Sequence, residues 1–220
     1  MFSVLNILFH RRGWSWYAAR TPRWLQACYP SLTWHVPIKN KVVYLTFDDG
    51  PIPIVTPFVL QTLKRYRAKA HFFCIGKNVT DNPNIYTQLL TQGHVVGNHS
   101  HNHLNGWKTP TNTYCHNVQQ ASTYINSKLY RPPYGRITRA QIKILRKQYR
   151  IIMWGVLSGD FDTSITAEKC YHNVITNISA GCIIVFHDSK KAYPHLQVVL
   201  PKVLLWLQNN GYTTALLPSY

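Results

Sequence analysis

Two adjacent carboxylates, Asp48 and Asp49, are placed where they could do chemistry. They follow the apolar run 41–47 and precede Gly50 and Pro51. Repulsion between neighbouring carboxylates raises the pKa of one of them unless a cation compensates. One of the pair could therefore bind a metal ion while the other handles protons. An Asp-Gly turn without further function is the alternative.

Three histidines lie within five residues, at His99, His101 and His103. On a helix, His99 and His103 would share a face at positions i and i+4, whereas on an extended strand all three would share one. Two imidazoles and one carboxylate make a three-ligand set that leaves zinc an open position for water. The alternative is a solvated polar loop, and the density of histidines favours the metal site.

Three further segments combine polar residues with restrained backbone or apolar strands. In residues 131–135 (RPPYG), two prolines stiffen the loop and could fix a guanidinium that clamps a carboxylate. Residues 154–162 contain Asp160, and residues 185–188 contain His187. A neighbouring aspartate can raise the pKa of an imidazole and make it a usable acid. Taken alone, residues 131–135 are better explained as a plain turn, and a histidine at the end of an apolar strand is more often structural than catalytic.

Strand and helix patterns alternate along the chain, and the candidate segments fall after expected strands. This alternation is typical of an α/β fold with parallel strands, either a barrel or an open sheet. In a barrel, active sites collect at the carboxyl ends of the strands. The expected strands cover residues 41–47, 70–75, 94–96, 129–130, 150–157, 182–187 and 212–217, and the expected helices cover 56–67, 83–92, 114–127, 138–147, 166–179 and 195–209.

Composition predicts one domain with a basic surface. The 220 residues are 45% hydrophobic, which is enough for a substantial core. Lys and Arg number 24 against 7 Asp and Glu, so the net charge is +17. Such a charge favours an anionic partner, such as an acidic polymer, a membrane surface or nucleic acid, or belongs to a basic surface without a specific partner.

The N-terminal residues 1–40 are basic and aromatic, and we separate them as a leader from a catalytic region over residues 41–220. Residues 1–24 could lie on a membrane surface or form an irregular leader. No apolar stretch approaches the ~20 residues of a spanning helix, and positive charges follow the N-terminal apolar run instead of preceding it. With five cysteines and no C-x-x-C pair, we predict a cytoplasmic or membrane-peripheral protein without a disulfide framework.

Taken together and in order, these segments resemble those of the polysaccharide deacetylase family. That family includes chitin deacetylases, peptidoglycan N-acetylglucosamine deacetylases and nodulation-type chitooligosaccharide deacetylases. The similarity runs from about Lys41 to Gly211, and its most specific parts are T-F-D-D-G, G-N-H-S-x-x-H and R-P-P-Y-G. The resemblance implies a distorted barrel of parallel strands with outer helices. It also implies a metal-dependent hydrolase that removes the N-acetyl group of an amino sugar and releases acetate.

By motif position, the resemblance implies roles for eight residues. They are Asp48 as the catalytic base, Arg131 as the residue that orients it, Asp49, His99 and His103 as metal ligands, Tyr134 as the donor of a backbone N–H to the oxyanion, His187 as the catalytic acid and Asp160 as its partner. His101 matches a variable position and stays outside the ligand set. The implied cofactor is Zn²⁺, with Co²⁺ or another divalent ion as alternatives.

Three residues depart from the family pattern, which often has Asp at Leu157, Trp at Phe161 and Leu at Val185. Phe161 and Val185 still provide an apolar wall suited to an acetyl methyl group. We expect an N-acetylated glycan as substrate, association with anionic surfaces through the basic charge, and no obligate nucleic-acid partner. Two other functions stay open: an amidohydrolase that acts on a small cyclic amide, and a non-catalytic binder of anionic glycan or nucleic acid.

Overall fold

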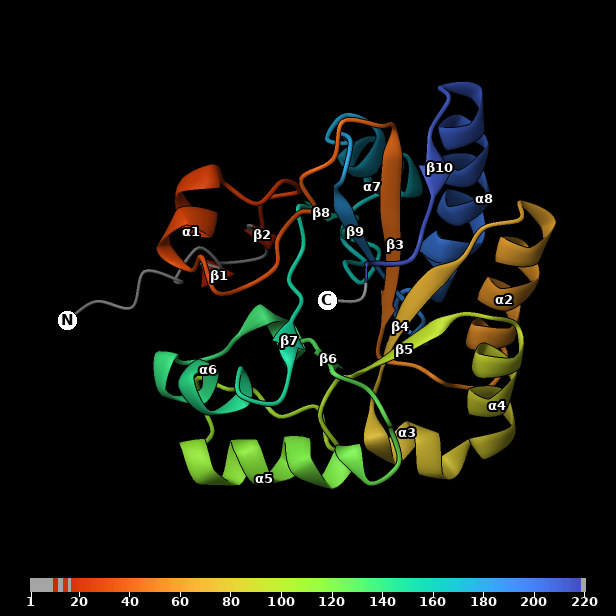
Figure 1. Ribbon diagram of the computed structural model, residues 1–220. Helices are drawn as coiled ribbons and strands as arrows, with labels where there is room; N and C mark the ends of the chain where they lie inside the picture. Colours follow the sequence, from red (N-terminus) through yellow and green to blue (C-terminus); the bar gives the residue numbers. More distant parts are fainter. Residues whose placement is uncertain (1–9, 12–13, 16, 219–220) are drawn as a thin grey trace.

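A parallel sheet that curls into an incomplete barrel forms the centre of the molecule (Figure 1). The computed structural model describes residues 10–11, 14–15 and 17–218. Within these residues the strands lie in the order β7-β6-β5-β4-β3-β9-β8, and each neighbouring pair is parallel. The seven strands and the helices around them confirm the predicted α/β barrel class.

The elements follow one another as the alternating pattern predicts. The barrel strands are β3 (Val42–Asp48), β4 (Ala70–Cys74), β5 (Val95–Asn98), β6 (Leu129–Tyr130), β7 (Arg150–Ile151), β8 (Val156–Leu157) and β9 (Ile183–His187). The helices around them are α2 (Val55–Arg65), α3 (Gly76–Asp81), α4 (Pro83–Thr91), α5 (Thr111–Ser122), the 3-10 turn η1 (Pro133–Gly135), α6 (Arg139–Leu145), α7 (Ala167–Ile175) and α8 (Tyr193–Asn209). The short pair β1 (His10–Arg11) and β2 (Trp14–Ser15) and helix α1 (Arg23–Cys28) precede them, and β10 (Thr213–Thr214) pairs with β3 near its start.

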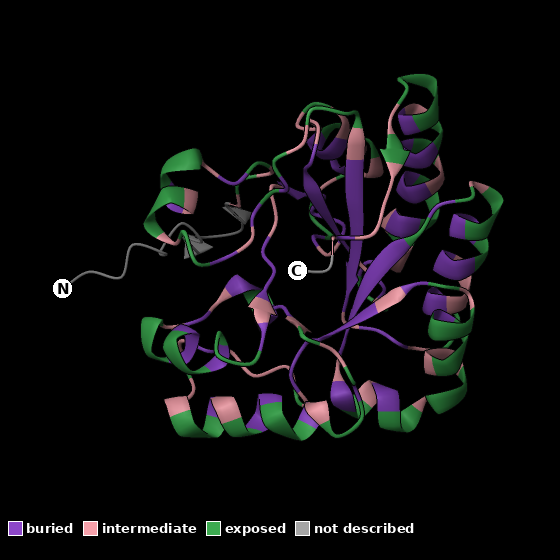
Figure 2. Ribbon diagram, in the orientation of Figure 1, coloured by how far each residue is buried: buried purple, intermediate pink, exposed green. Residues whose placement is uncertain are grey.

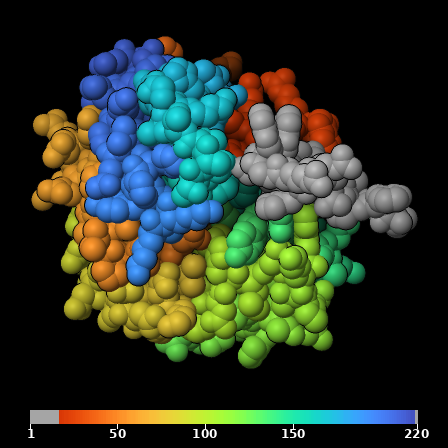
Figure 3. Space-filling view, turned by 180° about the vertical axis from the view of Figure 1, so that it is seen from behind, coloured from red at the N-terminus to blue at the C-terminus, as the bar shows by residue number. Residues whose placement is uncertain are grey.

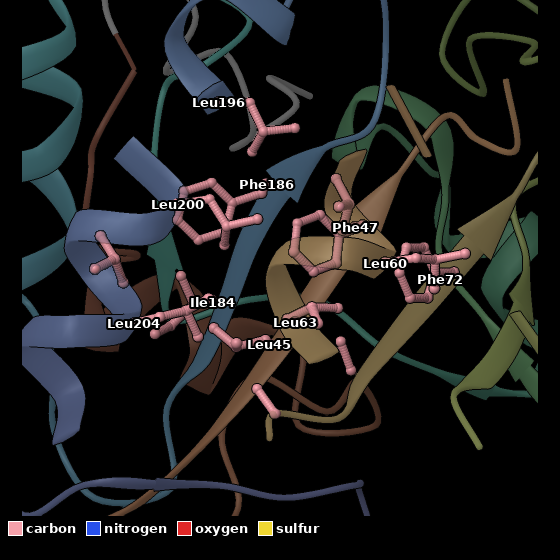
Figure 4. Packing of buried hydrophobic residues seen from close by; sticks show 14 of the residues in the cluster. Leu45, Phe47, Leu60, Leu63, Phe72, Ile184, Phe186, Leu196, Leu200 and Leu204 are labelled. Carbon is pink, nitrogen blue, oxygen red and sulfur yellow. The ribbon is translucent and has the colours of Figure 1, made fainter. Parts of the chain in front are cut away.

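Strand β3 lies at the centre of the core because helices and neighbouring strands cover it. Phe47 stacks between Phe72 and Phe186, with ring centroids 5.1 and 5.8 Å apart. Leu200 and Leu204 of α8 pack against this cluster (Figure 4). Burying each side chain of this size stabilises the fold by roughly 1.5–3 kcal/mol. The buried residues line the strands and the inner helix faces, and the outer helix faces are exposed (Figure 2).

The prediction of one strand over residues 150–157 is wrong. At its start the segment pairs as β7 with β6, and at its end it pairs as β8 with β9. These are the two opposite edges of the sheet, so residues 152–155 cross the barrel between them. Ile152 and Met153 are nevertheless buried. Apolar composition therefore suits a crossing segment as well as it suits a continuous strand.

Residues 17–36 fill the space between the two sheet edges. Thr33 forms a parallel bridge with Ile152, and Arg20 forms an antiparallel bridge with Val156. Side chains from this segment enter the second core cluster, namely Leu25, Leu32 and Trp34. The division of the chain at residue 40 stays a prediction. The surface role predicted for residues 1–24 falls partly on residues 1–9, 12–13 and 16, outside the described residues.

The remaining predicted elements are present with shifted ends. Helices α1 and α3 have no predicted counterpart, because each spans six residues and offers no apolar period to read. None of the described helices is long and apolar enough to cross a membrane. The predicted cytoplasmic or membrane-peripheral location stays a prediction.

Candidate metal and catalytic site

The two adjacent carboxylates at the end of β3 have different surroundings. Asp48 is the last residue of the strand and is 3% exposed. Nη1 of Arg131 donates to Oδ1 of Asp48 at 2.7 Å. Asp49 follows with a φ of 84°, in the left-handed region that non-glycine residues seldom adopt. The backbone therefore changes direction between the two carboxylates.

Arg131 is fully buried, and acceptors from two segments of the chain satisfy its donors. Besides Asp48, Nη1 reaches Oγ1 of Thr46 at 2.7 Å, while Nε and Nη2 donate to the carbonyl oxygens of Ile152 and Met153 at 3.1 and 3.0 Å. The guanidinium also lies 4.1 Å from the ring centroid of Phe73. Burial lowers the pKa of Arg131 and the charge of Asp48 opposes this. The guanidinium is thus a fixed positive charge that orients the Asp48 carboxylate.

Asp49, His99 and His103 bring three metal-binding atoms together. Nε2 of His103 lies 3.2 Å and Nε2 of His99 lies 3.6 Å from Oδ1 of Asp49, and the three ligand atoms lie within 4.8 Å of one another. Oδ1 of Asp49 is buried without a well-formed hydrogen bond among the described residues. Such a convergence of acceptor atoms suits a cation.

The electrostatics of these three side chains favour ligation. Nδ1 of His99 donates to the carbonyl oxygen of Arg131 at 2.8 Å, which leaves Nε2 as the ligand atom. Burial lowers the pKa of His99 to about 4, so its imidazole is neutral at pH 7. Burial acts to raise the pKa of Asp49, but the surrounding imidazoles outweigh it and hold that pKa below its ordinary value. A neutral imidazole and an ionised carboxylate are the forms that bind metal ions.

The histidine segment 99–103 is neither a helix nor a strand. Ser100 and His103 have φ values of 63° and 54°, so the chain loops and returns His103 beside His99. Oδ1 of Asn117 accepts hydrogen bonds from the backbone N–H groups of His101 and Asn102 at 3.1 and 3.0 Å. The ring of His101 stacks on Tyr124 and lies outside the metal cluster found among the described residues.

The partly buried His187, at the end of β9, pairs with the buried Asp160, which follows the neighbouring strand β8. Asp160 accepts from the His187 backbone N–H through Oδ2 and contacts Nδ1 through Oδ1, both at 2.7 Å. Burial acts to lower the pKa of His187, but the charge and hydrogen bond of Asp160 outweigh it and raise that pKa to about 9. The imidazole is therefore protonated at pH 7. Because β9 pairs with β3, Asp48 and His187 lie directly opposite in register.

The predicted apolar residues line one cavity of about 580 Å³ together with Asp48, Asp49 and His187. The ring of Phe161 meets His187 edge-on, with centroids 5.1 Å apart. Val185 and Leu157 also line the cavity. The cavity lies where early, middle and late parts of the chain meet, and Figure 3 shows a hollow between orange, green and blue segments.

Tyr134 lies at the rim of the cavity and is 55% exposed. Its φ is 60°, and its ring lies 4.5 Å from that of His103. The prolines before it hold this turn, as the sequence predicts. Eight of the ten predicted site residues thus line one cavity, while Arg131 and Asp160 lie outside its lining and contact Asp48 and His187. The individual roles of these residues stay predictions.

Sequence analysis missed several residues of the cavity. Tyr17, which packs on Phe161 with centroids 5.2 Å apart, comes from the N-terminal segment. Trp154 and Arg136 lie within or beside segments that the sequence singled out, but nothing in the pattern assigned their side chains to the cavity. Their aromatic or charged side chains are typical of binding cavities and could have been noticed. Only the crossing of residues 152–155 explains why segments far apart in the sequence line the same cavity wall.

Comparisons with known proteins give a consistent result. A family model described as polysaccharide deacetylase matches residues 35–149. The chain is 32% identical over 188 residues to a peptidoglycan-N-acetylglucosamine deacetylase of Bacillus cereus, covering 82% of this chain and 88% of that protein. It is 30% identical over 154 residues to a chitooligosaccharide deacetylase of Azorhizobium caulinodans, covering 66% and 73%.

A solved structure gives the same answer for the fold. It is a peptidoglycan N-acetylglucosamine deacetylase in complex with 4-naphthalen-1-yl-N-oxidanyl-benzamide. The TM-score is 0.83 at 30% sequence identity, and the alignment covers 90% of this chain and 95% of that one.

Proposed function

The chain belongs to the polysaccharide deacetylase family, and we propose that it is a metal-dependent hydrolase that removes the N-acetyl group from an acetylated amino sugar in a glycan. One observation supports this proposal above all others. Three side chains that could bind one metal ion, a second carboxylate held by a buried arginine, and a protonated imidazole held by a buried aspartate all line the same cavity. Metal-dependent amide hydrolysis uses this combination of a Lewis acid, a base and an acid.

Asp49, His99 and His103 would hold the divalent ion, and we propose Zn²⁺, with Co²⁺ or another divalent ion as alternatives. The fit rests on the buried Oδ1 of Asp49, which has no well-formed hydrogen bond among the described residues, and on the two Nε2 atoms beside it. One carboxylate and two imidazoles leave room for water and substrate on such an ion. When bound, the ion supplies Lewis-acid polarisation of the acetamide carbonyl.

The side chains of the cavity would carry the proton transfers. Asp48 accepts a proton from the water that attacks the carbonyl carbon, because Arg131 fixes its Oδ1 and leaves Oδ2 as the acceptor. The backbone N–H of Tyr134 donates to the developing oxyanion. As the C–N bond breaks, His187 gives a proton to the leaving nitrogen from Nε2, since Asp160 holds Nδ1. Acetate and a free amine are the products.

The apolar wall would select the acyl group. Val185 and Leu157 are nearly fully buried, and with Phe161 they present methyl and ring carbons to the cavity. A wall of this kind favours a small apolar group such as the acetyl methyl over a charged one. This assignment supports an N-acetyl substrate and leaves the sugar ring in the wider part of the cavity.

Acetate release from a panel of acetylated glycans tests the proposal. We expect release from chitooligosaccharides or peptidoglycan strands, its loss on chelation, and its recovery on addition of zinc. A cyclic ureide-type amide belongs in the panel, because its turnover without release of acetate from any glycan would favour the alternative amidohydrolase.

A matched pair of variants tests the base. Asp48→Asn should keep its bound zinc and lose about 10²–10⁴-fold in turnover, the usual contribution of a positioned general base. The control Asp81→Asn removes an exposed carboxylate that pairs with Lys77 on α3 and should keep normal turnover. Near-normal turnover in Asp48→Asn would remove Asp48 from the base role.

A further inference from the structure

Arg136 is a cavity residue whose buried Nε–H group has no acceptor among the described residues. It lines the same cavity as Asp48 and Asp49. Its Nε atom is buried, and among the described residues it has no hydrogen-bond partner. A buried donor without an acceptor is unfavourable, and in native structures such a group calls for an explanation. Arg131 provides the contrast, because chain atoms satisfy its donors.

The surroundings of Arg136 hold its guanidinium in place. Its Cζ lies 5.2 Å from the ring centroid of Trp107, and Nε1 of Trp107 donates to the carbonyl oxygen of Ile137 at 3.3 Å. The side chain of Gln141 fixes the adjoining loop by donating to the carbonyl oxygen of Gly106 at 2.8 Å. The guanidinium is therefore held against a fixed ring at the cavity wall, and a ligand would not need to order it.

The charges around the cavity favour an anion at this position. Among the described cavity residues, Asp48 and Asp49 are the only carboxylates, and they belong to the catalytic end. Lys191, in the loop between β9 and α8, also lines the cavity. In strand order, β6 and β9 lie on opposite sides of β3. A glycan placed over Asp48 would meet cationic side chains from both sides.

We propose that Arg136 binds a carboxylate of the glycan, on the reacting sugar or on its neighbour, while Lys191 adds positive charge at another part of the cavity wall. This inference rests on the proposed function and names its substrate class: an acidic N-acetylated glycan, in preference to a neutral one. The planar guanidinium can donate two parallel hydrogen bonds to a carboxylate, which fixes the position of the sugar as well as attracting it. Arg136 thus positions the substrate and takes no part in the proton transfers.

A matched pair of substrates tests the inference. One is an oligosaccharide that alternates N-acetylglucosamine with a carboxylated sugar, and the other is the same oligosaccharide with its carboxylates converted to methyl esters. We expect the protein to favour the acid over the ester by about tenfold in kcat/KM, the lower end for hydrogen bonds between charged groups. The preference should weaken as salt is added.

Variants assign the preference to Arg136. In Arg136→Gln the acid-to-ester ratio should fall to near one, and in Arg136→Lys it should be partly retained. The control Lys147→Gln removes a positive charge from an exposed residue outside the cavity and should keep the tenfold ratio. Equal turnover of acid and ester by the unaltered protein, or an unchanged ratio in Arg136→Gln, would overturn the inference.

The outcome is separable from that of the proposed function. If no oligosaccharide releases acetate, the proposed function fails. Calorimetric binding of the two intact oligosaccharides, which are then stable ligands, measures an acid-to-ester ratio of binding constants and still tests Arg136. The ester comparison uses the unaltered protein, so it decides the question even where a variant folds poorly.

Discussion

Replacing Asp160 with asparagine should change the pH dependence of acetate release. Asp160 is fully buried, and both of its carboxylate oxygens contact His187. Burial alone would lower the pKa of His187, and the carboxylate reverses this and raises the pKa to about 9. An asparagine has nearly the same shape but no charge. In the variant, burial is opposed only by the smaller contributions of Asp49 and Asp48, so we expect the pKa of His187 to fall below its ordinary value of about 6.5.

The size of the effect follows from this shift. The rise from about 6.5 to about 9 corresponds to roughly 3 kcal/mol in favour of the protonated imidazole. At pH 7.5 the protonated fraction of His187 is then about 97%, and with a pKa below about 6.5 it falls under about 10%. If His187 is the acid, Asp160→Asn should lose at least about tenfold in kcat/KM at pH 7.5 and regain activity towards pH 6.

The assay is the rate of acetate release between pH 5.5 and 10 for the unaltered protein and the variant. A bound divalent cation disfavours the nearby proton on His187, so the alkaline limb of the pH–rate profile of the metal-loaded protein should lie below pH 9. The prediction concerns the shift of this limb between the unaltered protein and the variant. Asp162→Asn is the matched control, because it removes a carboxylate two residues away and should leave the limb in place. An alkaline limb that stays put in Asp160→Asn would refute the role of this pair.

The same pair makes a stability prediction with a definite sign. The pKa of His187 is raised in the folded state, so the folded protein holds this proton more tightly than the unfolded chain does. The stabilisation is fully present below about pH 6.5 and is lost as the pH rises through about 9. The midpoint of urea unfolding of metal-free protein should fall over this range, and Asp160→Asn should remove most of that fall.

Three further predictions concern the parts that hold the site. Arg131→Met should destabilise the fold by about 3–5 kcal/mol in urea unfolding, because it leaves the buried Asp48 carboxylate without its partner; a loss under 1 kcal/mol would contradict this. Gly181→Ala should lower the unfolding temperature by several degrees, since its φ is 78° and a Cβ would lie 1.9 Å from a backbone oxygen; an unchanged temperature would count against the contact between residues 17–36 and the barrel. His99→Ala should lose bound zinc while the control His101→Ala retains it, and equal zinc contents measured by elemental analysis would refute the ligand assignment.

Much of the barrel could be predicted because its elements have strong local signals. Buried parallel strands such as β3 and β9 are continuous apolar runs, and α8 repeats its apolar residues at helical spacing. The crossing at residues 152–155 could not be predicted in this way. Its apolar residues are buried in the core although the segment lies in neither edge strand of the sheet. The segment instead forms a bridge with residues 17–36, more than a hundred residues earlier in the chain.

The members of the site could be predicted better than its geometry. Carboxylates and histidines that follow parallel strands must gather at one end of a barrel, so their proximity follows from the fold class. The approach of His99 to His103 has another origin. It needs positive φ values at Ser100 and His103, and it needs Asn117 of a separate helix to bind the loop. Neither spacing nor composition contains that tertiary contact.

The different surroundings of the two adjacent aspartates show what backbone conformation adds to a sequence motif. Both side chains are carboxylates, and from the sequence either could bind the ion or accept the proton. Asp48 continues the strand and meets the fixed charge of Arg131 at 2.7 Å, a contact that orients it while leaving one oxygen available. Asp49 takes a φ of 84° and turns to two imidazoles. A residue in this conformation is strained by roughly 1–3 kcal/mol, and an ion bound by Asp49 would offset that cost. Relaxing the turn with Asp49→Gly would therefore remove a ligand and leave the Asp48–Arg131 pair unchanged.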